Sequence, residues 1–72
     1  MTNSLTINTS NLLSLIHKAE AELKANPNPD LQMVNETVVS ILAFHMRRPY
    51  VVVNYAQANA IDKLKSLLGE KQ

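Results

Sequence analysis

The side chains that could do acid–base or metal chemistry are thinly spread along this 72-residue chain. His17 and Glu20 are three residues apart, so on a helix they would share a face and could hold one ligand. A metal site normally uses three or four protein groups, which makes solvated surface residues the better interpretation. Glu20 and Glu22 are two apart and would point in different directions. We therefore expect no metal and no catalytic pair here.

The other chemical signals also favour a protein that is not an enzyme. The chain has no cysteine, which excludes disulfides, thiolate catalysis and zinc sites of the cysteine type. Its one glycine, Gly69, lies near the end, so there is no glycine-rich phosphate loop. His45 lies on an apolar stripe near the end of an expected helix. A histidine at that position more often interacts with the last carbonyls of the helix, or lines a contact, than transfers protons. We expect no cofactor.

A basic and aromatic cluster occupies the segment HMRRPYVVVNY, residues 45–55. Arg47 and Arg48 could contact phosphates beside the stacking surfaces of Tyr50 and Tyr55. The simpler interpretation is that the arginines finish a helix, because the helix dipole favours basic residues in the last turn. The net charge of +1 argues neither for nor against a polyanionic partner.

The N-terminal segment carries a second nucleic-acid hypothesis. The run SLTINTSNLLSLIHKAEAEL, followed by a turn and another helix, resembles the layout of ribbon-helix-helix repressors over residues 4–44. The resemblance implies a dimer in which a short N-terminal strand pairs with its twin and lies in the DNA major groove. Leu5 and Ile7 would then face the core. The residues facing the bases would be Ser4, Thr6 and Asn8.

Asparagines and prolines divide the chain into elements. We expect helices at about 9–25, 29–47 and 55–68, with an extended segment at 50–53. The predicted caps are Asn8 (or else Thr9 or Ser10), Asn28 followed by Pro29, and Asn54. Pro49 disfavours helix at Arg48 and should end the second helix.

Apolar residues recur at helical spacing in all three helices. The predicted inner faces are Leu12, Ile16, Ala19 and Leu23; then Leu31, Val34, Val38, Ile41, Leu42 and His45; then Ala60, Ile61, Leu64, Leu67 and Leu68. The second helix carries a further apolar set, namely Met33, Val39, Ala43, Phe44 and Met46. A helix apolar nearly all round is either central in a bundle or covered by a partner chain. Part of this helix, TVVSILAF at residues 37–44, is rich in β-branched residues. Because such residues favour strands, a strand is the competing interpretation of this segment.

The run YVVV, residues 50–53, is the strongest strand signal in the chain. It is either a buried connector in extended form or a strand. As a strand it would pair with a partner or a twin, or with Leu5-Thr6-Ile7, which is the other strand-like piece.

Together these features predict one mainly helical domain over residues 1–72, with three helices and a possible short N-terminal strand. A chain this short buries only about 60% of its unfolded surface, so we expect a homodimer whose shared core contains the second helix. The expected function is a small non-enzymatic protein-binding module, a regulator or inhibitor, with a dimeric DNA-binding regulator as the alternative. No apolar run approaches the ~20 residues that span a bilayer, and no signal peptide is visible, so we expect a cytoplasmic protein without a membrane partner.

Two sets of contact residues follow from these hypotheses. The predicted partner or dimer contacts are Met33, Val38, Ile41, Phe44, Tyr50, Val51 and Val53. The predicted nucleic-acid contacts are Thr6, Asn8, Arg47 and Arg48.

Overall fold

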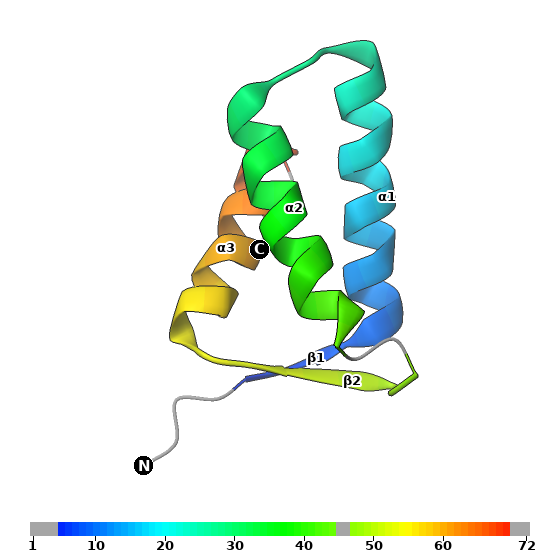
Figure 1. The fold of residues 1–72 in the computed structure, drawn as a ribbon, viewed down its shortest axis with the longest axis vertical. Coiled ribbons are helices and arrows are strands. Elements are labelled where there is room, and N and C mark those ends of the chain that lie inside the picture. The colour runs from blue at the N-terminus through cyan, green and yellow to red at the C-terminus, as the bar shows by residue number, and fades with distance from the viewer. Residues whose placement is uncertain (1–4, 45–46, 70–72) are drawn as a thin grey trace.

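Three helices stand on a short two-stranded ribbon (Figure 1). The computed structural model describes residues 5–44 and 47–69. In chain order its elements are β1 (Leu5–Asn8), α1 (Thr9–Ala25), α2 (Pro29–Ala43), β2 (Tyr50–Val53) and α3 (Tyr55–Leu67). The predicted fold class, mainly helical with an extended segment between the second and third helices and a short N-terminal strand, is confirmed.

Asparagine side chains start all three helices. The Oδ1 atom of Asn8 accepts the backbone N–H groups of Ser10 and Asn11, at 2.9 and 3.2 Å, so Asn8 is the cap of α1. The side chain of Asn28 accepts two N–H groups of α2 in the same way. Asn54 and Gln57 form a reciprocal capping box on α3. Each cap satisfies donors that a helix start leaves without an intrahelical partner, and so fixes where the helix begins.

Replacing the cap of α3 should weaken the fold measurably. In Asn54→Ala we expect the free energy of unfolding to fall by about 1 kcal/mol, because the N–H of Gln57 loses its acceptor. Asn59→Ala is the matched control, since Asn59 is exposed within the same helix and alanine is the better helix former there. Urea denaturation of both variants measures the difference, and equal stabilities would contradict the role of the cap.

The second helix ends earlier than its sequence predicts. α2 stops at Ala43 with Phe44 as its C-cap, and Arg47 lies in the turn before β2, so the prediction that the helix continues to about residue 47 is wrong. The reason is a pair of hydrogen bonds from Thr9: its N–H donates to the carbonyl of Pro49 at 2.9 Å, and its hydroxyl to the carbonyl of Arg48 at 2.6 Å. These bonds hold the turn against the start of α1. His45 and Met46 lie outside the described residues.

The ribbon resolves the question raised by YVVV. β2 is a strand that pairs antiparallel with β1, with Leu5 opposite Val53 and Ile7 opposite Val51. Because side chains alternate across a strand, Val51 and Val53 face the helices and are buried, whereas Tyr50 and Val52 face outward and are exposed. Two of the three valines therefore belong to the core of this chain.

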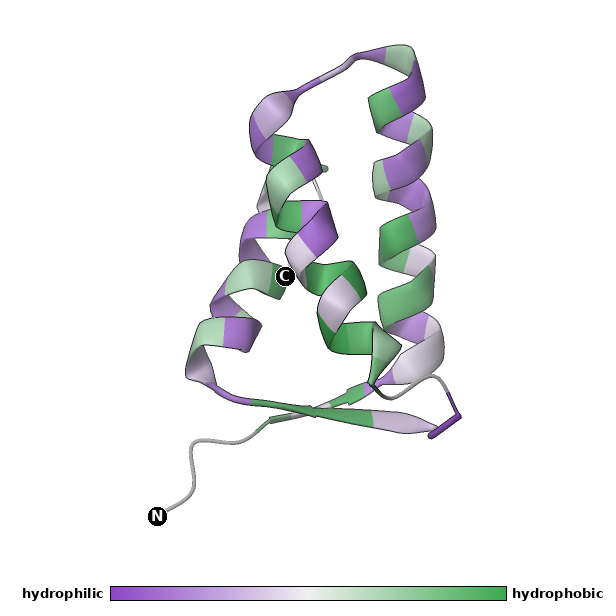
Figure 2. Cartoon of the chain, in the orientation of Figure 1, coloured by the Kyte–Doolittle hydropathy of each residue, from purple (hydrophilic) through white to green (hydrophobic). Residues whose placement is uncertain are grey.

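The core lies where the inner faces of the helices meet above the ribbon, as the hydropathy colours of Figure 2 illustrate. α2 packs against both α1 and α3, which gives it a central place in the bundle of a single chain. TVVSILAF is helical up to Ala43, so its strand interpretation is wrong. The buried set includes Leu12, Leu15, Ile16, Ala19, Leu31, Val34, Val38, Ile41, Leu42, Val51, Val53, Ala58, Ile61 and Leu64. Within the described residues, no helix has both the length and the apolar character needed to cross a membrane.

Candidate binding surface

The predicted partner contacts separate into two groups in the folded chain. Four of them fill the chain's own core: Val38, Ile41, Val51 and Val53. The other three, Met33, Phe44 and Tyr50, are exposed. The described fold thus leaves only the second group open to a partner.

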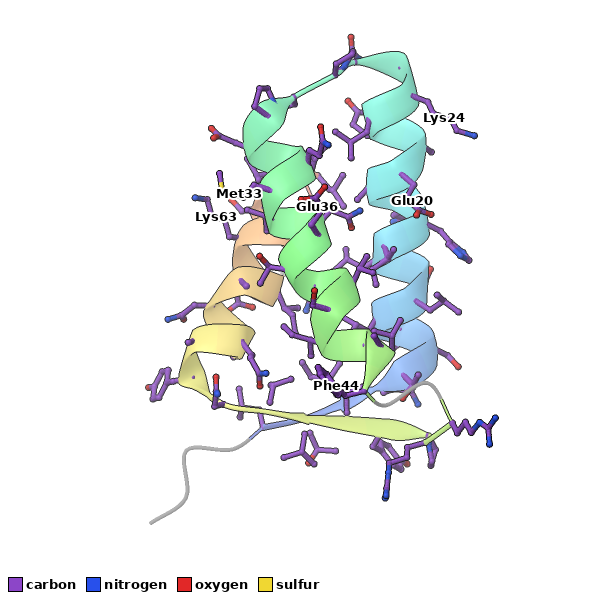
Figure 3. The ribbon with its side chains drawn as sticks, viewed as in Figure 1. Glu20, Lys24, Met33, Glu36, Phe44 and Lys63 are labelled. Atoms are coloured by element: carbon purple, nitrogen blue, oxygen red, sulfur yellow. The ribbon has the colours of Figure 1, made fainter. Side chains whose placement is uncertain are left out.

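Exposed aromatic and apolar side chains gather beside the ribbon. Phe44, which is 84% exposed, lines an open hollow of about 550 Å³ together with Arg48, Pro49, Tyr50 and Val52. Figure 3 places Phe44 at the ribbon end of α2. Thr6 pairs with Val52 across the ribbon and shares its outward face. We name this surface the ribbon face; it consists of Thr6, Phe44, Arg48, Pro49, Tyr50 and Val52.

The fold also brings together the two sets of predicted nucleic-acid contacts, which lie about forty residues apart in the chain. Asn8 is opposite Tyr50 in the ribbon, and the hydroxyl of Thr9 donates a hydrogen bond to the carbonyl of Arg48. Arg47 is exposed in the same turn. Asn8 has a structural task as well, because its Oδ1 atom caps α1. Thr6 is therefore the cleaner residue for testing whether β1 contacts a ligand.

Charge is unevenly distributed between the two ends of the molecule. Residues 5–19 and 37–61 contain no aspartate or glutamate, and both arginines lie in the second of these segments. At about 1.5 Å of helix per residue, Glu20 lies ~16 Å along α1 from its ribbon end, and Glu36 and Asp62 lie ~10 Å along α2 and α3 from theirs. Figure 3 shows Glu20 and Glu36 well above the ribbon. The ribbon end is thus cationic although the whole chain is nearly neutral.

The resemblance to ribbon-helix-helix repressors implied that Leu5 faces the core; Leu5 does lie on the core side of the ribbon, but it is 55% exposed. Its register partner Val53 is only 1% exposed and lies on the same face of the ribbon. The difference arises because α2 and α3 pack against β2, whereas β1 contacts α1, the helix that continues from it. Alternation along the strand gives the correct side for Leu5, but it cannot tell how far the helices extend over that side.

A second hollow of about 360 Å³ lies between α1 and α2. Its lining is Leu13, Ile16, His17, Glu20, Val39, Leu42 and Ala43. His17 and Glu20 do share a face, as their spacing predicts. In the part of the chain that the structure describes, no group of three or more His, Cys, Asp or Glu side chains is placed to hold a metal ion.

Asn35 is a buried polar residue that the sequence interpretation missed. It is 6% exposed in α2, and its Oδ1 atom accepts no hydrogen bond. A buried amide oxygen without a donor costs about 1–3 kcal/mol. The sequence spacing could have predicted this burial. Asn35 follows Leu31 by four residues and precedes Val38 by three, so it lies on the same helix face as the buried apolar residues.

Comparison with known proteins finds no family model, no curated protein and no solved structure that matches the chain. The geometry and charge of the ribbon end are therefore the basis for a functional proposal.

Proposed function

We propose that this protein is a small non-enzymatic interaction module that works in the cytoplasm as a homodimer, with the free edge of β1 as the contact between two copies. The observation that carries the proposal is Leu5. It faces the core side of the ribbon, opposite a fully buried valine, and yet more than half of its surface is open. A second copy placed along β1 would cover it.

The edge of β1 is suited to pairing with an identical edge. Among the described residues the sheet has two strands, so one edge of each strand is unpaired. Proteins usually protect such edges with lysine, proline or a bulge, but β1 reads LTIN and carries none of these. Because the strand has no charge, two copies can approach without repulsion. A twofold axis perpendicular to the sheet would place both ribbon faces on the same side of the dimer.

The exposed face of α2 is a weaker candidate for the dimer contact. Glu36, Thr37 and Ser40 lie along the middle of that face, between Met33 and Phe44. All three are polar and exposed, and the hydroxyls of Thr37 and Ser40 are already bonded to backbone carbonyls one turn earlier, so they offer little apolar area to a second copy. We therefore propose the edge of β1 as the dimer contact, in place of the second helix, which the sequence had suggested.

A dimer built in this way would present two ribbon faces to a larger partner. Exposed apolar patches mark interaction sites, and two linked copies of one site bind a repeated target more tightly than either copy alone. Regulation or inhibition would then result from occupying the partner's surface.

The oligomeric state tests the proposal directly. By light scattering after size exclusion, we expect the native mass to be twice the 8.0 kDa of the chain. Leu5→Lys should give the monomer mass, because it places like charges at the shared edge. The control Met33→Lys, at an exposed position on α2, should remain dimeric. A wild-type chain that stays monomeric from micromolar to millimolar concentration, or a Leu5→Lys variant that stays dimeric, would overturn the proposal.

A further inference from the structure

We propose that the ribbon face binds single-stranded nucleic acid, with bases stacked on Phe44 and Tyr50 and phosphates held by Arg48 and by Arg47 beside it in the same turn. The inference rests on the proposed function in one respect, since it specifies the chemical class of the partner of the ribbon face, and it does not depend on dimerisation. It rests on three features of the ribbon end: its charge, its exposed rings and its shortage of hydrogen-bonding groups.

The charge of the ribbon end suits a polyanion. Arg47 and Arg48 are both exposed, and the nearest carboxylates on α2 and α3 are about 10 Å of helix away. That separation exceeds the Debye length of ~8 Å at physiological ionic strength, so the carboxylates do little to offset the arginines. The N-terminal ends of α1 and α3 also lie at the ribbon and add positive potential, partly offset by the C-terminal end of α2 (Figure 1).

The exposed rings suit unstacked bases. Phe44 and Tyr50 come from different elements, the C-cap of α2 and the start of β2, and line one open hollow with Arg48 between them in the chain. A hollow of about 550 Å³ lies within the ~300–1,000 Å³ range of small-ligand sites. Base-on-ring stacking tolerates any sequence, because every base has a flat face, and arginine beside a ring strengthens it.

The outward side of the ribbon is poorly equipped to read a duplex. Base edges in the major groove are read by paired donors and acceptors, as on arginine, asparagine or glutamine. Here the outward strand positions are Thr6, Asn8, Tyr50 and Val52, and the Oδ1 atom of Asn8 is occupied by its capping bonds. Apart from the arginines, which we assign to phosphates, the outward side chains offer a base only rings, hydroxyls, a valine and the amide of Asn8, which favours splayed bases over an intact base pair. We therefore infer a single strand as the ligand.

Fluorescence anisotropy with labelled oligothymidylate and oligouridylate of about 16 nucleotides tests the proposal. Phe44→Leu and Tyr50→Ile remove a ring but keep apolar bulk, net charge and the edge of β1. Each should weaken binding by about five- to 150-fold, the range that the loss of one stacked base produces. Tyr55→Leu is the control, because Tyr55 is an even more exposed tyrosine that does not line the hollow. Both rings are largely exposed, so these variants should fold, which circular dichroism verifies.

The dependence on salt gives a second readout. Two arginines per chain predict a slope of log affinity against log salt near −1.4, and Arg48→Ala should reduce its magnitude by about 0.7. Lys63→Ala, on α3, should leave the slope unchanged. A tighter complex with duplex DNA of the same length, or equal binding by polyglutamate, would overturn the proposal, as would no binding at low salt. Native masses of the same samples show separately whether the dimer proposal fails.

Discussion

Val38→Asp is expected to unfold the protein, whereas Val39→Asp is expected to leave it folded. Val38 is 0% exposed in the middle of α2, and its neighbour Val39 is 40% exposed at the hollow between α1 and α2. A carboxylate at Val38 would be taken out of water with no partner, a penalty of several kcal/mol. A domain of this size has only about 4–11 kcal/mol of stability in total, at roughly 0.05–0.15 kcal/mol per residue.

Circular dichroism and heat denaturation distinguish the two variants. The Val38→Asp chain should lose most of its helical signal, and the Val39→Asp chain should unfold within a few degrees of the wild type. A folded Val38→Asp variant would mean that α2 is not the centre of the bundle. The same would follow if Val39→Asp were the more damaging change.

Within β2, we expect Val53→Ala to lower the free energy of unfolding by about 2–3 kcal/mol and Val52→Ala to change it by less than about 0.5 kcal/mol. Val53 is buried under the helices, so its truncation removes apolar contacts and leaves a cavity. Val52 points outward into the ribbon face and loses little. The substitution is chemically identical and the positions are adjacent, so strand propensity cancels in the comparison.

Chemical denaturation of the two alanine variants measures this difference. Equal losses would indicate that the side chains of β2 do not alternate between core and solvent as the register with β1 requires. A larger loss in Val52→Ala would indicate that a partner chain covers the ribbon face in solution.

Local signals predicted the helices well, since three asparagine caps mark their starts. The end of α2 was misplaced because its determinant is not local. Thr9, some forty residues earlier in the chain, donates hydrogen bonds to the carbonyls of Arg48 and Pro49. The partner of β2 was left open for the same reason: a strand signal gives no information about which distant segment lies beside it.

The candidate site was predicted only in part. Thr6 was named from the resemblance to ribbon-helix-helix repressors and Arg48 from its residue type, but only the paired strands show that they belong to one surface. The net charge of the whole chain did not reveal the cationic ribbon end, because the carboxylates that balance the arginines lie along the helices, away from the ribbon. The exposure of Leu5 was missed, since it depends on how far the helices reach over the ribbon.

The pairing of Leu5 with Val53 also has a consequence for the order of folding. The strands of the ribbon are separated by all of α1 and α2, so it cannot form as a local hairpin, and closing that loop costs entropy that helix packing must first offset. We expect the ribbon to form late, after the helices have met. A ligand that recognises the ribbon face would thus select chains that have completed folding and, by mass action, hold them in that state.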